Sequence, residues 1–282
     1  MTATQAQIRI PNGAVTLVAD EYRIDDPRGN VLLWHGGGQT RHSWKSTSGH
    51  IAAAGWTAVS FDTRGHGDSD WAPDGDYTMD ALVGDIVVAA QRYPDPILVG
   101  ASLGGLMSLV AVGTGRVKAQ ALVLADVAPR IERDGTRRIG EFMREHAETG
   151  FASLDEVADA VAGYNPHRPR PANLDGIRKN VRQREDGRWY WHWDPRMMPR
   201  DIDEPTREVG MDRLRAAARA VTVPTLLVRG RQSDVLGEEG VREFLELVPH
   251  ARFVAVGGAG HMVAGDDNDA FAHAVIDFLE SL

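Results

Sequence analysis

Short runs of apolar residues recur along the chain, and segments with helical periodicity separate them. The runs are rich in β-branched residues or leucine, which favours strands buried on both faces. They cover residues 31–34, 57–61, 96–99, 121–124, 224–228 and 253–256. In segments such as 82–90 and 271–282, apolar residues return on one face of a helix. This alternation predicts an α/β protein with a parallel sheet covered by helices on both sides.

The beginning of the chain departs from this alternation. Two short segments, residues 7–10 and 15–20, flank the turn sequence Pro11-Asn12-Gly13. A turn of this kind between two such segments predicts an antiparallel hairpin. The expected sheet is therefore mostly parallel, with an antiparallel pair of strands at its start.

The alternation also stops between residues 127 and 221. This stretch shows no strand pattern, but it holds helical segments, a proline-rich segment at 165–171 and aromatic residues at 189–193. An insertion after the carboxyl end of a strand lies over the crevice in which open α/β sheets bind ligands. We therefore expect residues 127–221 to form a helical cap on a core that consists of residues 1–126 and 222–282.

Composition and charge narrow the class of protein further. The 282 residues include no cysteine, which excludes disulfides, thiolate metal sites and a cysteine nucleophile. A net charge of -9 argues against a nucleic acid or an anionic membrane as partner. Residues 1–10 contain neither a basic nor an apolar run, and no stretch approaches the length of a membrane span. We expect a cytoplasmic protein.

The sequence Gly100-Ala101-Ser102-Leu103-Gly104 connects a predicted strand to an apolar helix. This context suits a nucleophile elbow, in which a sharp turn lifts a serine hydroxyl above the edge of the sheet. The flanking glycines leave room for the crowded backbone. We therefore predict that Ser102 is a nucleophile rather than a simple turn residue.

A serine nucleophile needs a base within hydrogen-bond reach, and the base needs a group that holds its tautomer. His261 follows the predicted strand 253–256 in a glycine-rich loop, and Asp234 follows the strand 224–228. Both belong at the carboxyl edge of the sheet, in the order acid and then histidine. We expect His261 to act as the base and Asp234 to orient it. Asp126 also follows a strand and is the alternative acid, although we interpret it as a helix or loop cap.

Three glycines follow the strand 31–34 in the sequence His35-Gly36-Gly37-Gly38. Because glycine has no side chain, backbone amides in such a segment come close to a substrate oxygen. We expect the amides of Gly37 and Leu103 to form an oxyanion hole, with Gly38 as a third donor. One such donor contributes about 3 kcal/mol of transition-state stabilisation.

These motifs, together with Asp62-Thr63-Arg64-Gly65-His66-Gly67-Asp68-Ser69, resemble those of the α/β-hydrolase-fold enzymes over nearly all of the chain. The resemblance implies a mostly parallel eight-stranded sheet flanked by helices, with a helical cap inserted after strand 6. It is closest to the branch that contains small esterases, cofactor-free haloperoxidase-like enzymes and carbon–carbon bond hydrolases. The cap carries no motif of that branch, so the resemblance does not define the substrate.

The expected function is that of a serine hydrolase. It would cleave a carboxylic ester or lactone of a small to medium, partly apolar substrate through an acyl-enzyme on Ser102, without a metal or other cofactor. Two alternatives keep the same triad, namely carbon–carbon bond hydrolysis and perhydrolysis of the haloperoxidase-like type. A third alternative is a ligand-binding receptor on a hydrolase scaffold.

Aromatic residues of the cap are candidates for the substrate pocket. We expect Trp189, Trp191 and Trp193 to line it together with Met262, which follows the predicted base. The other interpretation is that these aromatic residues form the core of the cap itself. The expected partner is a small molecule, with neither nucleic acid nor membrane, and monomer and homodimer both stay open.

Overall fold

The computed structural model describes residues 3–164, 170, 173–198, 204–257, 260–261 and 269–282. Its centre is an eight-stranded sheet in the order β1-β2-β4-β3-β5-β6-β9-β10. The strands are β1 (Thr4–Asn12), β2 (Val15–Arg23), β3 (Asn30–Trp34), β4 (Thr57–Phe61), β5 (Ile97–Ala101), β6 (Ala121–Ala125), β9 (Thr225–Gly230) and β10 (Arg252–Val256). β1 and β2 form the expected hairpin, and β2 also pairs antiparallel with β4. The other pairings in this sheet are parallel, which confirms the mostly parallel eight-stranded sheet.

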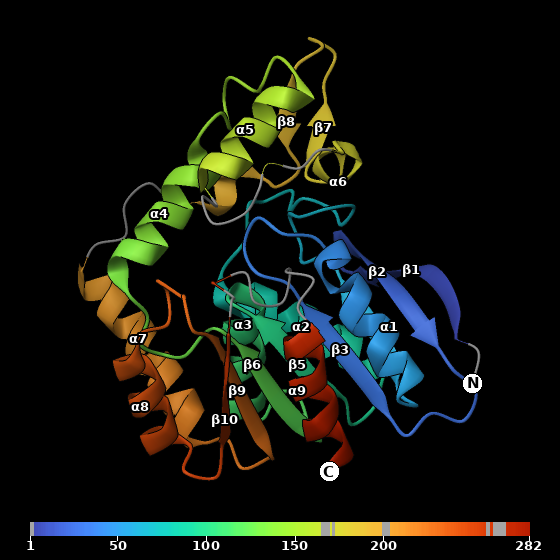
Figure 1. Ribbon diagram of the computed structural model, residues 1–282, viewed down its shortest axis with the longest axis vertical. Coiled ribbons are helices and arrows are strands. Elements are labelled where there is room, and N and C mark those ends of the chain that lie inside the picture. Colours follow the sequence, from blue (N-terminus) through green and yellow to red (C-terminus); the bar gives the residue numbers. More distant parts are fainter. Residues whose placement is uncertain (1–2, 165–169, 171–172, 199–203, 258–259, 262–268) are drawn as a thin grey trace.

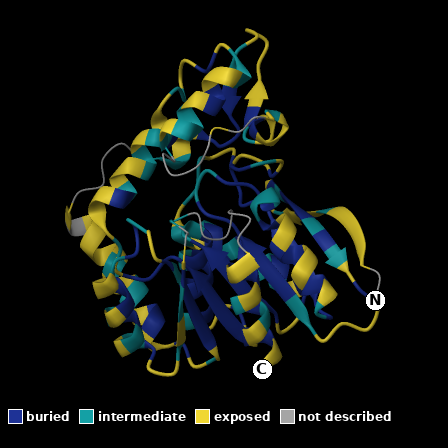
Figure 2. Cartoon of the chain, viewed as in Figure 1, coloured by how far each residue is buried: buried dark blue, intermediate teal, exposed yellow. Residues whose placement is uncertain are grey.

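Helices cover both faces of the sheet (Figures 1 and 2). All residues of central strands such as β5 and β6 are therefore buried. One face is covered by α1 (Lys45–Ala53) and α9 (Asp269–Glu280). The other face is covered by α2 (Met79–Arg92), α3 (Leu103–Gly113), α7 (Glu204–Arg219) and α8 (Glu238–Leu247). Among the helices that the structure describes, none combines the length and the apolar character needed to cross a membrane.

The carboxyl ends of β5, β6, β9 and β10 lie at one edge of the sheet, because these strands are parallel and in register. Ala101 at the end of β5 pairs with Ala125 at the end of β6. Gly230 at the end of β9 pairs with Val256 at the end of β10. The residues that directly follow these strands therefore meet above the same edge.

A second layer, the cap, follows β6 in the sequence and lies over this edge (Figure 1). Its elements are α4 (Arg133–Arg144), α5 (Leu154–Tyr164), α6 (Asp175–Arg178), β7 (Val181–Gln183), β8 (Trp189–Trp191) and the 3-10 helix η2 (Pro195–Met197). The cap has its own buried cluster, which includes Phe151, Val157 and Trp191. The sequence predicted a helical cap, but the cap also contains two strands, since β7 and β8 form an antiparallel pair. Strands of three residues are too short to show a period of two in the sequence.

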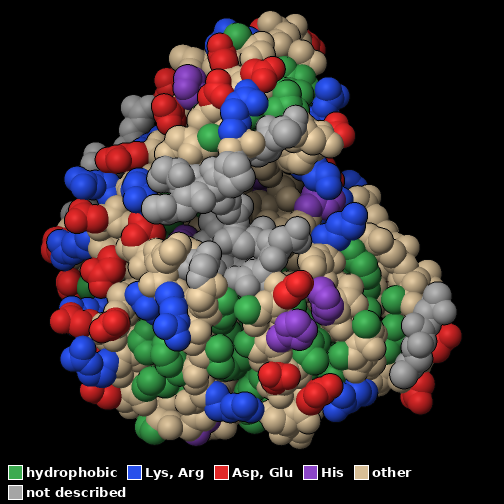
Figure 3. Space-filling view, in the orientation of Figure 1, with side chains coloured by type: hydrophobic (Ala, Val, Ile, Leu, Met, Phe, Trp, Pro, Cys, Tyr) green, Lys and Arg blue, Asp and Glu red, His purple; other side chains and the backbone are tan. Residues whose placement is uncertain are grey.

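The last helix of the expected cap packs on the sheet domain instead. α7 lies so close to α3 that a Cβ added at Gly113 would come within 2.1 Å of the carbonyl oxygen of Ala217. Arg215 Nε of α7 also donates to Glu243 Oε1 of α8 at 2.7 Å. Charged side chains of both signs are interspersed over these two helices on the face shown in Figure 3. Among the described residues, the elements over the edge of the sheet therefore end with η2, whereas the expected cap extended to residue 221 and included α7.

Replacement of Gly113 by alanine is expected to destabilise the protein by about 1–3 kcal/mol, because the added methyl group overlaps a backbone oxygen. Gly210 of α7 is the matched control, since it is exposed and a Cβ added there meets no atom within 4 Å. Gly210→Ala should stabilise the protein by about 1 kcal/mol through helix propensity. Urea denaturation followed by circular dichroism measures both effects. Equal effects of the two substitutions would contradict the packing of α7 on α3.

Candidate active site

Ser102 lies on the sharp turn between β5 and α3. Its backbone has φ 47° and ψ -116°, in a region that residues other than glycine rarely adopt. The turn requires glycine on both sides, because a Cβ at Gly100 would lie 2.3 Å from the carbonyl oxygen of Gly104. A Cβ at Gly104 would lie 2.2 Å from the carbonyl oxygen of Trp34. The geometry of the turn is that of a nucleophile elbow.

His261 forms a hydrogen bond with a carboxylate at the end of β6. Its Nδ1 lies 2.8 Å from Oδ2 of Asp126, whose side chain is fully buried. Asp126 also accepts hydrogen bonds from the backbone N–H of Gly230, at 2.9 Å, and from the hydroxyl of Ser233. Since an ionised carboxylate only accepts hydrogen bonds, Nδ1 carries the proton and Nε2 is left as an acceptor.

The acid expected from the sequence, Asp234, does not contact His261 in the structure. Its carboxylate pairs with the guanidinium of Arg138 in the cap at 2.6 Å, and its side chain is 38% exposed. The loop after β9 contributes Ser233 to the support of Asp126 instead. In the structure, the carboxylate next to His261 is therefore that of Asp126 and not, as expected, that of Asp234. The sequence signal for Asp126 is its place directly after β6, the neighbour of β5 in the sheet, but Asp234 also follows a strand.

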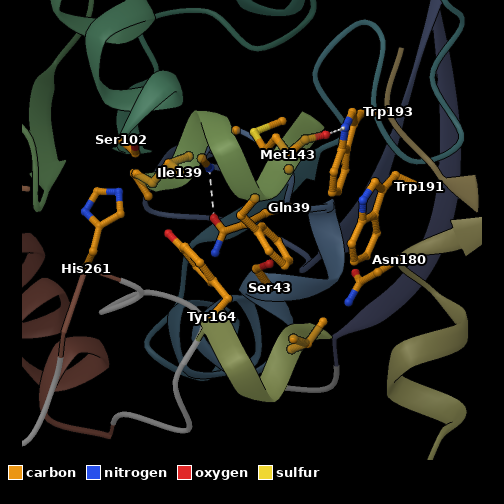
Figure 4. A pocket seen from close by; sticks show the side chains of 16 residues that line it. Gln39, Ser43, Ser102, Ile139, Met143, Tyr164, Asn180, Trp191, Trp193 and His261 are labelled. Atoms are coloured by element: carbon orange, nitrogen blue, oxygen red, sulfur yellow. Dashed lines mark hydrogen bonds between the residues drawn. The ribbon is translucent and has the colours of Figure 1, made fainter. Parts of the chain in front are cut away.

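Ser102 and His261 line one cavity of about 230 Å³ between the sheet domain and the cap (Figure 4). The sheet domain contributes residues 36–39, Ser43, Ala101, Ser102 and His261. The cap contributes Ile139, Phe142, Met143, Val161, Tyr164, Asn180, Trp191 and Trp193. Among these described lining residues, His261 is the only one with a basic side chain, and none has a carboxylate. The hydroxyl of Tyr164 is a weak acid. The wall is therefore mainly aromatic and aliphatic, with a few neutral polar groups.

The loop of residues 36–39, called the oxyanion loop after its expected role, forms one side of the cavity next to Ser102. Within the described residues, the amides of Gly37 and Leu103 have no hydrogen-bond partner. Leu103 is the first residue of α3, where backbone N–H groups have no partner inside the helix. Gly37 lines the cavity, whereas Leu103 is not among the lining residues. These two N–H groups are the donors left for a substrate oxygen.

Gly38, the expected third donor, has its N–H engaged elsewhere. That group donates to Nε2 of His66 at 3.1 Å. A backbone amide has a single proton, so this hydrogen bond removes Gly38 from the expected set of oxyanion donors. The sequence could not show this, because the ring of His66 comes from the loop after β4.

Three buried histidines, His35, His66 and His192, support the loops behind the cavity. Nε2 of His35 accepts from the backbone N–H of Thr63 at 3.0 Å. Nδ1 of His192, in the cap, accepts from the N–H of Gly67 at 2.7 Å. The ring of His66 lies between them, with centroids 4.9 Å and 5.8 Å from the two other rings. No group of three metal-ligating side chains occurs among the residues that the structure describes.

The expected pocket residues divide between the wall and the rest of the cap. Trp191 and Trp193 line the cavity and stack on each other at 4.7 Å, and both also belong to the buried cluster of the cap. Trp189 is not a lining residue, and Arg178 lies over its ring at 5.4 Å. Met262 lies outside the described residues. Trp191 and Trp193 therefore contribute both to the wall of the cavity and to the core of the cap.

The model of the Alpha/beta hydrolase family matches residues 31–274. The chain therefore belongs to the alpha/beta hydrolase family. Esterase Rv0045c of Mycobacterium tuberculosis is 29% identical over 259 residues, which cover 89% of this chain and 83% of that esterase. The 3-hydroxybutyrate-oligomer hydrolase of Cupriavidus necator is 29% identical over 216 residues, which cover 73% of each protein.

Solved structures show the same fold. A structure of the M. tuberculosis esterase Rv0045c superposes with a TM-score of 0.77 at 28% identity, covering 98% of this chain and 92% of that chain. E-2-(acetamidomethylene)succinate hydrolase superposes with a TM-score of 0.79 at 24% identity and supports the fold alone. It covers 98% of this chain and 100% of that chain. The chain is thus a hydrolase, and its family implies a small-molecule substrate.

Acid should destabilise the protein through its buried histidines. Burial lowers the pKa of His35 to about 4 and that of His66 to about 3, and it lowers the pKa of His192 well below its usual value. The unfolded chain therefore binds more protons below about pH 6.5, and stability is lost as the pH falls from there towards the folded values. Each such histidine should reduce the free energy of unfolding by about 1.4 kcal/mol per pH unit.

Urea denaturation at pH 7.5, 6.5 and 5.5 measures this slope. His66→Gln should make the slope shallower by the contribution of one histidine, whereas His273→Gln, at an exposed position of α9, should leave it unchanged. A free energy of unfolding that stays constant over this range would show that the three rings are not held in their neutral form.

Proposed function

We propose that this protein is a serine esterase that hydrolyses neutral carboxylic esters or lactones of small to medium size with an apolar part. The observation that carries the proposal is the geometry of one cavity. Ser102 on its elbow and the hydrogen-bonded pair of His261 and Asp126 belong to the same edge of the sheet, and both Ser102 and His261 line this cavity.

The reaction begins when Ser102 Oγ attacks the ester carbonyl carbon and passes its proton to Nε2 of His261. The carbonyl oxygen becomes an oxyanion, which accepts hydrogen bonds from the amides of Gly37 and Leu103. The tetrahedral intermediate then collapses, and the alcohol leaves with the proton that His261 returns. Water, activated by His261, attacks the acyl-enzyme and releases the carboxylic acid and free Ser102.

Asp126 has an orienting role in this sequence. Its carboxylate accepts the Nδ1 proton of His261, which keeps Nε2 free to receive the serine proton. Its negative charge also stabilises the imidazolium that forms during each proton transfer. The backbone N–H of Gly230 and the hydroxyl of Ser233 hold the carboxylate in place.

The lining of the cavity supports a neutral substrate. No described lining residue besides His261 could neutralise a charged group, and an unpaired charge buried in such a wall costs several kcal/mol. Burial and the nearby carboxylate of Asp234 raise the pKa of Tyr164 to about 12, so its hydroxyl stays protonated. Figure 4 shows this hydroxyl on the side of the cavity that holds Ser102 and His261. Tyr164, Ser43 and Asn180 thus offer neutral hydrogen bonds to an otherwise apolar substrate.

The proposal is tested by labelling with a fluorophosphonate, followed by intact mass spectrometry, together with hydrolysis of short p-nitrophenyl esters. Wild type should form one stoichiometric adduct that is absent in Ser102→Ala. Turnover should fall by about 10⁴-fold or more in Ser102→Ala and in His261→Ala. A folded wild-type protein without adduct or turnover would exclude the esterase and favour a binding role for the cavity.

The two aspartates give a matched pair of substitutions. Asp126→Asn should lower kcat by about 10⁴-fold, because the amide is uncharged and, with its oxygen on the Gly230 N–H, presents an NH2 donor to Nδ1 of His261, which selects the wrong tautomer. Asp234→Asn should change kcat by less than about threefold, since it removes only a partly exposed ion pair with Arg138. Steady-state kinetics on one ester measures both. The reverse order of effects would return the orienting role to Asp234.

Substrate charge gives a further prediction. The kcat/KM for a p-nitrophenyl ester of a dicarboxylic acid, with its second carboxylate free, should lie about 100-fold below that for the neutral ester of equal chain length. Ile139→Lys, which places a cation in the cavity wall, should narrow this difference. If wild type hydrolyses the two esters equally well, the cavity does not select for neutral substrates.

A further inference from the structure

The segment from Trp191 to Asp194 presents alternate side chains to two parts of the protein. Trp191 and Trp193 line the cavity, as part of the cap wall. His192 and Asp194 contact the sheet domain, where the hydroxyl of Tyr77 donates to Asp194 Oδ2 at 2.5 Å. The position of the wall is therefore fixed by the side chains that alternate with its tryptophans.

The ring of His192 joins two loops of the sheet domain. It is only 2% exposed, and both of its nitrogens have backbone partners. Nδ1 accepts from the N–H of Gly67 at 2.7 Å, so the proton of the neutral ring lies on Nε2. Nε2–H in turn faces the carbonyl oxygen of Gly38 at 3.4 Å. One side chain of the cap thus contacts the loop after β4 and the oxyanion loop.

Gly38 is held on both sides by histidine rings. Its N–H donates to His66, its carbonyl oxygen faces His192, and its φ of +75° is one that favours glycine. Gly37 directly precedes it, and the peptide plane between them contains the Gly37 carbonyl. Gly37 and Gly38 are the two central residues of a turn, which the N–H of Gln39 closes on the carbonyl oxygen of Gly36 at 3.1 Å. The Gly36–Gly37 peptide, which carries the Gly37 N–H, therefore takes its direction from a turn whose geometry at Gly38 is set by the two rings.

We propose that His192 is a positioning residue for the oxyanion hole: by fixing Gly38 it directs the Gly37 N–H towards the substrate oxyanion and makes the hole depend on the docked cap wall. The inference rests on the proposed esterase function. A cap element that carries two cavity-lining tryptophans then also sets the geometry of the hole across the cavity.

A second contact of the cap with the same region allows a positioning role of His192 to be distinguished from simple anchoring of the cap. Arg182 of β7 donates to the carbonyl oxygen of Gly67 at 3.1 Å and to Asp68 at 2.8 Å, but it forms no hydrogen bond or ion pair with the described residues of the oxyanion loop. Arg182→Gln therefore weakens docking of the cap without touching Gly38. It is the control for a purely structural effect.

His192→Phe, which keeps a ring of similar size, should lower kcat on a short neutral ester by about 10- to 100-fold. KM should change by less than about threefold, since the contact of Asp194 with Tyr77 still holds the tryptophan wall. His192→Gln should recover part of the loss, because its amide nitrogen can still donate to Gly38. Arg182→Gln should keep kcat within about twofold of wild type. A His192→Phe variant with wild-type kcat, or an equal loss in Arg182→Gln, would overturn the proposal.

A second measurement does not depend on esterase activity. In protein labelled with ¹⁵N-glycine, hydrogen exchange of the Gly38 amide should become at least about tenfold faster in His192→Phe or His192→Gln than in wild type. His273→Phe, at an exposed site, should not change it. Unchanged exchange would show that His192 does not position the loop. Faster exchange in the His192 variants, combined with a wild type that shows no Ser102-dependent turnover, would instead refute the esterase function alone.

Discussion

The buried carboxylate of Asp126 is the constraint on which the active site depends. A charge at this depth is tolerated only when hydrogen bonds compensate for lost water, and three groups do so. The backbone of Gly230 comes from β9, Ser233 from the following loop, and His261 from the loop after β10. One carboxylate thus draws the ends of three neighbouring strands together and fixes the tautomer of the histidine.

Most of the sheet could be predicted from the sequence, because each buried strand is a separate apolar run. The elbow could be predicted because glycines flank Ser102 between a strand and a helix. The choice between Asp126 and Asp234 could not be predicted, since both follow strands and the sequence does not show which carboxylate faces His261. Strand register and the side chain of Ser233 decide it. The expected cap included α7 for a similar reason, because the helical pattern of α7 does not indicate that this helix packs on α3.

The polar interior behind the cavity also depends on contacts between segments distant in sequence. His66 and His192 come from different layers, yet both contact the backbone of Gly38. Each nitrogen of these rings has a defined hydrogen-bonding role, which only neutral imidazole can fulfil. An isolated histidine in a sequence carries no sign of such an arrangement. Side-chain packing, rather than local propensity, therefore determines which backbone amides stay available in the oxyanion loop.

The wall of the cavity combines two kinds of residue with different freedom to vary. Met143, Trp191 and Trp193 serve both the wall and the buried cluster of the cap, whereas Ile139 and Val161 line the cavity from partly exposed positions. Changes at the first group alter packing and specificity together. Changes at the second group alter the shape of the cavity at little cost in stability. Divergence towards new substrates, natural or engineered, therefore has its easiest route along the inner faces of α4 and α5.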